Sequence, residues 1–356
     1  MNSANDIASA TETRPGHHLA ESWEALKAED PSLRARDGAA QLGVSEAELL
    51  AARRDLGIRR LRRPWGNLVR NLSNLGPVMA LTRNDYVVHE KIGQFEEISV
   101  VDDLGLVLGS DIDLRIFFCH WHYGFAVTES VRNRTRRSLQ FFDRDGTAVH
   151  KVYLRPESSE DRFDALVSEH QHPDQSLRLV VQDKRASTDD LPHSEVNPSD
   201  LLTRWSSLED THDFHGMLQE LGIGRVQAFQ MVPENYARRV RNDSFQIALG
   251  RAANIGLSVM VFVGNPGTVQ IHTGPIHRLK QVGPWFNVLD PGFNLHLRGD
   301  KVTGAWVVRK PSRDGVVTSV EIFAQDGQQI AWLFGRRKPG EQELEAWREV
   351  AKSLTH

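Results

Sequence analysis

An internal repeat with an offset of 181 residues constrains the fold of this 356-residue chain more than any other feature. Residues 138–146 (SLQFFDRDG) match residues 319–327 (SVEIFAQDG), and the same offset holds without a gap between residues 115–155 and 296–336. A period this long lies far outside the range of roughly 20–50 residues that is typical of solenoid repeats. We therefore expect two domain-sized halves with the same order of elements.

Within each half, helical segments precede short β-rich segments, which end in a hairpin with an Asp-Gly turn at Asp145-Gly146 or Asp326-Gly327. This order predicts an α+β fold of two tandem repeats, each with helices and a large antiparallel sheet, and the same strand order in both. The expected division is a tail (1–18), an N-terminal repeat (19–155), a linker region (156–207) and a C-terminal repeat (208–356).

Composition narrows the class of protein. A hydrophobic content of 40% and a charged content of 25% are typical of a soluble globular protein, and the net charge of −4 argues against general binding to nucleic acid. The single cysteine, Cys119, excludes an internal disulfide. Residues 1–18 contain no apolar signal-peptide core, and the longest apolar run, near residues 255–263, is too short to cross a bilayer. We expect a cytoplasmic protein.

A short helix-turn-helix pattern occurs at residues 39–50, with Gly43 in the turn and Ser45 as the cap of the second helix. Six arginines follow it: Arg53, Arg54, Arg59, Arg60, Arg62 and Arg63. Such a segment could bind DNA, with the arginines on phosphates. A structural corner beside a solvated face is the more common meaning of this pattern, so we do not expect DNA binding as the main role.

Residues 209–221 predict an amphipathic helix. Phe214, Met217, Leu218 and Leu221 recur at helical spacing on one side, whereas His212, His215, Gly216 and Gln219 share the other side. The two histidines should therefore face solvent or a ligand. The positive end of a helix disfavours a charged imidazole, and neutral imidazole is the form that binds metal. A solvated polar face with two incidental histidines is the alternative.

Several local motifs that identify enzyme classes are absent from the sequence, so those classes are unsupported. We find no zincin motif, phosphate-binding loop, dinucleotide fingerprint or Gly-x-Ser-x-Gly nucleophile turn. His120 and His122 would share one face of a strand, where they could bind a metal or simply be exposed. A function therefore has to be inferred from the combination of separated segments.

Five separated segments give the chain a resemblance to the HemS/ChuS/HmuS family of bacterial cytoplasmic haem-trafficking and haem-degrading proteins. They are residues 111–117 (DIDLRIF), 210–215 (DTHDFH), 271–275 (IHTGP), 293–297 (FNLHL) and 306–311 (WVVRKP). The resemblance spans roughly residues 20–350, and the family is itself built from two repeats. It implies one b-type haem between the C-terminal sheet and helices at the domain junction.

The resemblance also implies roles for individual residues. The axial iron ligand of the family corresponds to His212, and the arginine on the opposite haem face corresponds to Arg115, with Phe117 packed beside it. Basic residues near the haem propionates correspond to Arg225 and Lys310. Many members have an aromatic residue at the position of His215, so it stays open whether His215 replaces His212 as ligand or receives haem in transit.

Three functions are compatible with these features. The first is a carrier for iron acquisition that accepts haem from an inner-membrane importer and delivers it to a haem oxygenase. The second is an enzyme that opens the porphyrin ring with dioxygen and an external reductant. The third is a haem-responsive regulator that binds DNA through residues 37–63. No flavin or nicotinamide motif is visible, so turnover would need external electrons, which favours the carrier.

Overall fold

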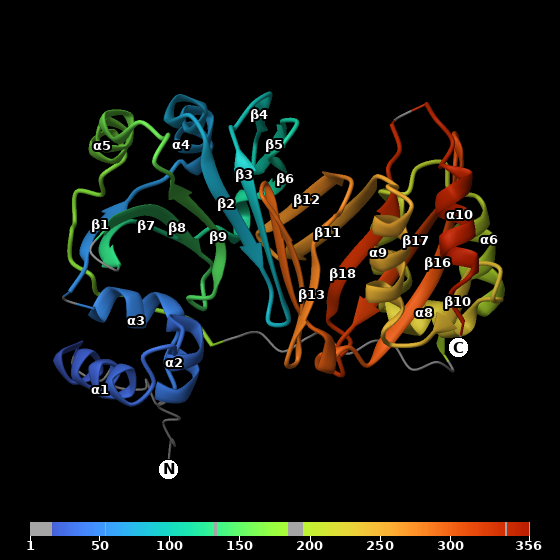
Figure 1. The fold of residues 1–356 in the computed structure, drawn as a ribbon, viewed down its shortest axis with the longest axis horizontal. Coiled ribbons are helices and arrows are strands. Elements are labelled where there is room, and N and C mark those ends of the chain that lie inside the picture. Colours follow the sequence, from blue (N-terminus) through green and yellow to red (C-terminus); the bar gives the residue numbers. More distant parts are fainter. Residues whose placement is uncertain (1–15, 54, 132–133, 184–194, 339, 356) are drawn as a thin grey trace, which may run out of the picture.

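Two nine-stranded antiparallel sheets form the centre of the computed structural model, which describes residues 16–53, 55–131, 134–183, 195–338 and 340–355 (Figure 1). In sheet A the strands follow the order β1 (Gly57–Leu61), β7 (Tyr123–Val131), β8 (Arg134–Phe142), β9 (Ala148–Leu154), β2 (Val78–Arg83), β3 (Val87–Gly93), β15 (Phe293–Arg298), β14 (Trp285–Asp290) and β13 (Leu279–Val282). In sheet B the order is β10 (Ala237–Val240), β16 (Gly304–Ser312), β17 (Gly315–Phe323), β18 (Gln329–Gly335), β11 (Val259–Asn265), β12 (Thr268–Gly274), β6 (Asp113–Phe117), β5 (Leu104–Leu108) and β4 (Ile98–Val101).

Each strand of sheet A has a counterpart in sheet B whose strand number differs by nine, and the counterparts follow the same order in the two sheets. This agreement confirms the predicted duplication. Strands β7, β8 and β9 become β16, β17 and β18 when 181 is added to their bounds. The Asp-Gly hairpins match as well: Gly146 and Gly327 both have φ of 77°, a left-handed conformation that favours glycine. Equal loop lengths thus reflect equal turn geometry.

Sequence patterns did not indicate that the halves exchange strands. Strands β4, β5 and β6 of the N-terminal half pair with β12 in sheet B, and β13, β14 and β15 of the C-terminal half pair with β3 in sheet A. Each half therefore supplies six strands to one sheet and three to the other. Figure 1 shows the result as two sheets that meet along β2, β3, β11 and β12.

The helices of the N-terminal half pack around sheet A. They are α1 (Gly16–Glu29), α2 (Ala35–Leu42), α3 (Glu46–Ala52), α4 (Trp65–Arg70), the 3-10 turn η1 (Asn71–Leu75) and α5 (Glu160–Glu169). Helix α4 also packs against β4 of sheet B. The predicted tail of residues 1–18 overlaps α1 by three residues, and residues 1–15 lie outside the described ranges. Helix α5 belongs to the predicted linker region, and its buried Phe163 and Leu166 join the N-terminal core.

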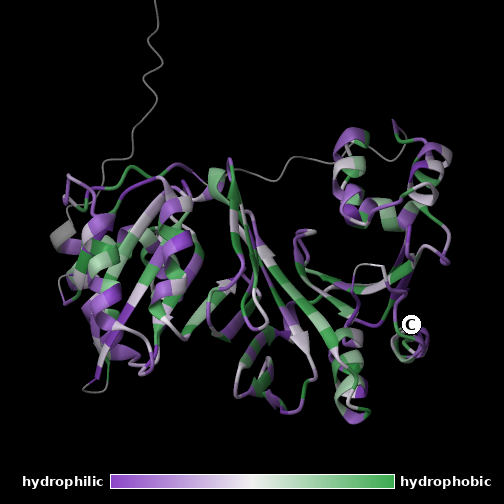
Figure 2. Ribbon diagram, turned by 90° about the horizontal axis from the view of Figure 1, so that it is seen from above, coloured by the Kyte–Doolittle hydropathy of each residue, from purple (hydrophilic) through white to green (hydrophobic). Residues whose placement is uncertain are grey.

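The helices of the C-terminal half lie on both faces of sheet B. Helices α9 (Ser244–Asn254) and α10 (Glu345–Lys352) bury apolar residues against one face. Helices α6 (Pro198–Ser206), α7 (Asp213–Leu221) and α8 (Arg225–Met231) form a separate apolar cluster with Trp306 and Val308 on the other face. Figure 2 shows this second group at the upper right, set apart from the N-terminal half. The helices therefore cover only the β10–β17 side of that face.

Candidate functional site

Helix α7 presents the face that its sequence predicts. Phe214, Met217 and Leu218 are buried in the cluster with α6 and α8, whereas His212, His215, Gly216 and Gln219 are exposed. Gly216 leaves open space beside these histidines, since an added Cβ would meet nothing within 4 Å. Both imidazoles are thus accessible to a ligand from solvent.

His212 occupies the residue just before α7, and Asp210 holds its side chain. The ring Nδ1 lies 2.6 Å from Asp210 Oδ1, which also accepts the backbone N–H of His212 at 2.9 Å. A carboxylate can only accept, so the proton sits on Nδ1 and the lone pair of Nε2 is directed elsewhere. These hydrogen bonds from the His212 backbone and ring lower the pKa of Asp210. This is the carboxylate–histidine arrangement that orients metal ligands in proteins.

Asp210 and Thr211 are residue types that favour helix caps, but neither occupies the cap position of α7. The residue at that position is His212, whose side chain makes no capping hydrogen bond. Asp210 does not cap because its carboxylate is occupied by His212. A residue that looked like a helix cap therefore orients the candidate ligand instead.

Behind α7, two cations share one buried carboxylate. Lys310 Nζ donates to Glu321 Oε1 at 2.6 Å, and Nη1 of Arg225 donates to Glu321 Oε2 at 3.3 Å. Ser319 Oγ and Gln329 Nε2 also donate to Glu321, at 2.9 and 2.7 Å. The Lys310 ammonium lies 4.5 Å from the centroid of the Phe214 ring, which joins this cluster to the buried side of α7.

The cluster carries one more positive than negative charge. Burial lowers the pKa of Lys310 to about 8, and Glu321 only partly offsets this effect. Burial would raise the pKa of Glu321, but Lys310 and Arg225 together hold it below its ordinary value. Burial lowers the pKa of the His215 imidazole, and the positive charge of the nearby Arg225 lowers it further. An additional anion would therefore be stabilised here.

A half-exposed apolar surface extends from this cluster across sheet B. We call it the apolar floor, and it consists of Met260, Phe262, Val269, Trp332 and Phe334, with Gly264 between them. The rings of Phe262 and Phe334 are 5.0 Å apart. Gly264 keeps the floor flat, because an added Cβ would come within 3.0 Å of Val269 and 3.6 Å of Trp332.

The residues of the apolar floor were not predicted, although the sequence of β11 carries a signal for them. In β11, Val259, Val261 and Val263 are buried on one side, while Met260 and Phe262 are also apolar on the other side. A strand that is apolar on both sides is expected to be covered on both sides. Here no helix of the described chain covers the second side, so the pattern indicates a ligand-binding surface.

Arg115 and Phe117 lie at the far end of the same face, on β6. Arg115 pairs with Val269 of β12 across the sheet, and its guanidinium forms an ion pair with Asp113. Burial raises the pKa of Asp113, and Arg115 partly offsets the shift. Four strand spacings of about 4.8 Å separate β6 from Glu321 on β17, roughly 19 Å in all. The structure thus brings His215, Arg225 and Lys310 together and places Arg115 and Phe117 across the floor from them.

Sheet A repeats this surface only in part. Met79, Leu81, Val88 and Tyr153 are half-exposed there, but at the positions that correspond to Trp332 and Glu321 it carries Lys151 and Gln140. Lys151 and Arg83 form ion pairs with Glu46 of α3, which lies over this part of the sheet. The pKa of Glu46 falls to about 2, since these cations outweigh the burial that would raise it. Duplication thus produced two similar sheets, and in sheet A charged side chains that pair with α3 interrupt the corresponding apolar face.

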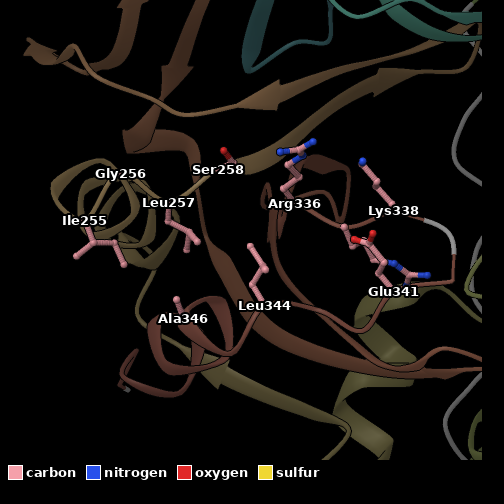
Figure 3. A pocket seen from close by; sticks show the side chains of 10 residues that line it. Ile255, Gly256, Leu257, Ser258, Arg336, Lys338, Glu341, Leu344 and Ala346 are labelled. Carbon is pink, nitrogen blue, oxygen red and sulfur yellow. The ribbon is translucent and has the colours of Figure 1, made fainter.

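A pocket of about 420 Å³ lies on the opposite side of sheet B, near the end of β18 (Figure 3). Its lining combines Arg336, Lys338 and Glu341 with the apolar Ile255 and Leu344. None of the candidate site residues lines it. The pocket is therefore distinct from the apolar floor.

The helix-turn-helix segment and the pair His120 and His122 do not lie in the surroundings expected of a binding site. In the helix-turn-helix segment, α3 is capped by Ser45 as predicted, but Ala47, Leu49 and Leu50 are buried against the protein. Arg53 pairs with Asp55, and Arg54 lies outside the described residues. His120 ends a 3-10 turn, η2 (Phe118–His120), so His120 and His122 do not share a strand face as predicted.

The described residues also set limits on metal and membrane sites. Among them, no three His, Cys, Asp or Glu side chains gather as a metal-binding group. None of their helices has the length and apolar character needed to span a bilayer. The exposed His212, with a single imidazole oriented by Asp210, fits an iron that is already held by four other ligands, as in a porphyrin.

Comparison with known proteins identifies the family of the chain. The family model described as "Haemin-degrading HemS.ChuX domain" matches residues 43–170 and 222–354. The chain belongs to this family. Its two matched segments correspond to the two halves of the duplication, as expected from the 181-residue offset.

Relatives and solved structures cover nearly the whole chain. The hemin transport protein HmuS of Yersinia pestis is 36% identical over 94% of this chain and 97% of that relative. The heme-binding protein PhuS of Pseudomonas aeruginosa, solved in its holo form, is 44% identical with a TM-score of 0.93, covering 96% of this chain and 99% of PhuS. The heme-degrading enzyme ChuS of Escherichia coli O157:H7 is 33% identical with a TM-score of 0.89, covering 96% and 100%. The fold of the chain is thus that of PhuS and ChuS.

Proposed function

We propose that this protein binds one haem b through the Nε2 atom of His212 and carries it within the cytoplasm. The observation that carries the proposal is the Asp210–His212 pair, which fixes Nδ1 as the protonated nitrogen on an exposed histidine. Neutral imidazole with a free Nε2 is the form that ligates haem iron. His215, one turn away on the same exposed face, is the second candidate ligand during transfer.

The apolar floor and the Glu321 cluster supply the other contacts that a haem needs. A porphyrin face is large and apolar, which suits Phe262, Trp332 and Phe334. The propionates need cationic donors, and the excess positive charge of Arg225 and Lys310 lies beside the floor. Arg115, held by Asp113 at the far end, is the candidate for the opposite haem face, with Phe117 beside it.

A carrier and a haem-degrading enzyme both fit this arrangement. The relation to ChuS, described as a heme oxygenase, favours the enzyme as the second candidate. We favour a carrier because Arg115 is already paired with Asp113, which weakens it as a donor to a developing negative charge. In this function the protein accepts haem from an inner-membrane importer and delivers it to a haem oxygenase.

Replacement of the two exposed histidines tests the binding site. We expect the double variant His212→Ala, His215→Ala to lose the wild-type Soret band and at least roughly tenfold in haem affinity, because loss of a hydrogen-bond partner of a metal-ligating histidine alone costs roughly 10–100-fold. Each single variant should retain part of the binding. Spectral titration measures both properties, and wild-type binding by the double variant would refute the ligand assignment.

Arg115→Ala separates the carrier from the enzyme. As a carrier, the variant should keep haem with a modestly perturbed Soret band, since only a distal contact is lost. Haem breakdown is measured with a physiological reductase in the presence of catalase, because free peroxide attacks haem without enzymatic control. Multiple-turnover ring opening by the wild type that disappears in Arg115→Ala would establish the enzyme instead.

A further inference from the structure

Exposed apolar side chains are concentrated at one end of sheet B. Of the nine exposed large hydrophobic residues in the described chain, four lie on strands β4, β5 and β6: Val101 (67% exposed), Leu104 (41%), Leu108 (46%) and Phe117 (36%). The register pairs Val101 with Leu104 and Leu104 with Phe117, so these side chains share one face. We call this face the β4–β6 edge.

The β4–β6 edge continues the apolar floor to the border of the sheet. Phe117 and Arg115 lie on the same side of β6, so the edge begins where the candidate haem site ends. Strand β4 is the last strand of sheet B, and its Val100 carbonyl accepts a hydrogen bond from Arg70 of α4 at 3.0 Å, so the exposed surface is formed by side chains and not by the strand backbone. A contiguous exposed apolar face is typical of a protein-binding surface.

The charge around the β4–β6 edge indicates what kind of molecule binds there. Residues 94–114 contain no lysine or arginine and carry six carboxylates: Glu96, Glu97, Asp102, Asp103, Asp111 and Asp113. Two cations reach this region, Arg115 in an ion pair with Asp113 and Arg70 at the Val100 carbonyl, so a net charge of −4 remains. Five of the carboxylates are exposed, and Asp113 is half-buried. Such a rim repels the propionates of haem, so the edge is not an extension of the haem site. It is complementary to a protein surface with a basic rim around an apolar centre.

The duplication provides an internal comparison. The matching residues 275–295, on β13, β14 and β15, carry Arg278 and Lys280 and a single carboxylate, Asp290. A second copy of the chain could place this basic end on the acidic edge. Such a contact could close as a reciprocal dimer or a ring, and would otherwise give open filaments. The basic end offers two cations to an edge that carries six carboxylates, so a different protein with a larger basic surface is the better fit.

We propose that the β4–β6 edge is the docking surface for the protein that receives haem, and that this acceptor contacts it through a basic surface. This inference rests on the proposed carrier function. The acceptor would bind directly beside the open end of the apolar floor, so that haem passes between the proteins without crossing water. The acidic rim steers the encounter, and the apolar side chains stabilise the complex.

Charge reversal tests the proposal. The variant Glu96→Lys, Asp103→Lys changes two exposed carboxylates whose backbone lies outside the left-handed region. Its matched control is Arg278→Glu, Lys280→Glu on the corresponding strands. Holo-protein is mixed with the apo-haem oxygenase of the same organism, or with apomyoglobin, which captures only haem that has dissociated spontaneously. Transfer rates are measured at low and high salt.

We expect transfer to the oxygenase to slow by roughly tenfold or more in the edge variant, because steering by surface charge is worth 10–10³ in association rate. Capture by apomyoglobin, the Soret band and the haem affinity should not change, and the control variant should behave as wild type. Equal transfer by both variants would overturn the inference, as would self-association of the wild type that the edge variant and the control variant both abolish. A wild type that fails to bind haem, or that gives it to the oxygenase no faster than to apomyoglobin, would refute the carrier function first.

Discussion

Asp210→Asn is the substitution that most directly tests how the site orients His212. An asparagine amide can donate to Nδ1 as well as accept from it. When it donates, the imidazole proton moves to Nε2, which removes the lone pair that binds iron. When it accepts, the imidazole keeps the correct tautomer and only the charge of the partner is lost.

The expected size of the effect follows from the exposure of the pair. Loss of a hydrogen-bonded partner of a metal-ligating histidine costs roughly 10–100-fold in affinity. The side chains of His212 and Asp210 are 87% and 59% exposed, so water and salt screen their interaction. We therefore expect the low end of the range, about tenfold, which is about 1.4 kcal/mol.

The assay compares haem affinity and the rate of haem release to apomyoglobin in Asp210→Asn and Asp213→Asn. Asp213 is exposed in the first turn of α7, and its substitution changes the charge near His212 by the same amount. Only Asp210→Asn should weaken binding by about tenfold, since orientation rather than charge is lost. Equal effects of the two substitutions would refute the reasoning.

Two further predictions concern the Glu321 cluster. Haem affinity should fall as the pH rises through about 8, because Lys310 loses its proton there and the cluster loses its excess positive charge. The variant Lys310→Arg should remove this pH dependence. Haem titrations between pH 7 and 9.5 measure the affinity, and a pH profile of the variant equal to that of the wild type contradicts the prediction. Glu321→Gln should lower the free energy of unfolding by about 3–5 kcal/mol at neutral pH, because the buried Lys310 and the half-buried Arg225 lose their shared carboxylate. Urea denaturation with Gln328→Glu, a half-buried neighbour in the β17–β18 hairpin, as the control checks this second prediction, which fails if the loss is below about 1 kcal/mol.

The exposed face of α7 and the duplication could be predicted from the sequence, because both follow from local patterns of residues. The spacing of Phe214, Met217 and Leu218 determines which side of the helix is buried, and the equal turns at Gly146 and Gly327 follow from equal loop lengths. These features depend on residues that are close together in the chain.

Features that depend on distant residues were not predictable in the same way. The ion pairs of Arg225 and Lys310 with Glu321 join residues 96 and 11 positions apart, so nothing local identifies the shared partner. The exchange of strands between the halves is similar, because β3 has equally suitable neighbours in either arrangement. Only the packing of the complete chain decides which strand it pairs with.

The strand exchange has a consequence for synthesis of the protein on the ribosome. Strand β3 ends at Gly93, and its partner β15 begins at Phe293, 200 residues later. At roughly 5–20 residues per second, the nascent chain waits about 10–40 s with this edge of sheet A unpaired. An open edge of that kind invites pairing with other chains. Translation that stops within this interval should therefore yield an aggregation-prone product, whereas completion of β15 closes sheet A and releases a chain that folds as one unit.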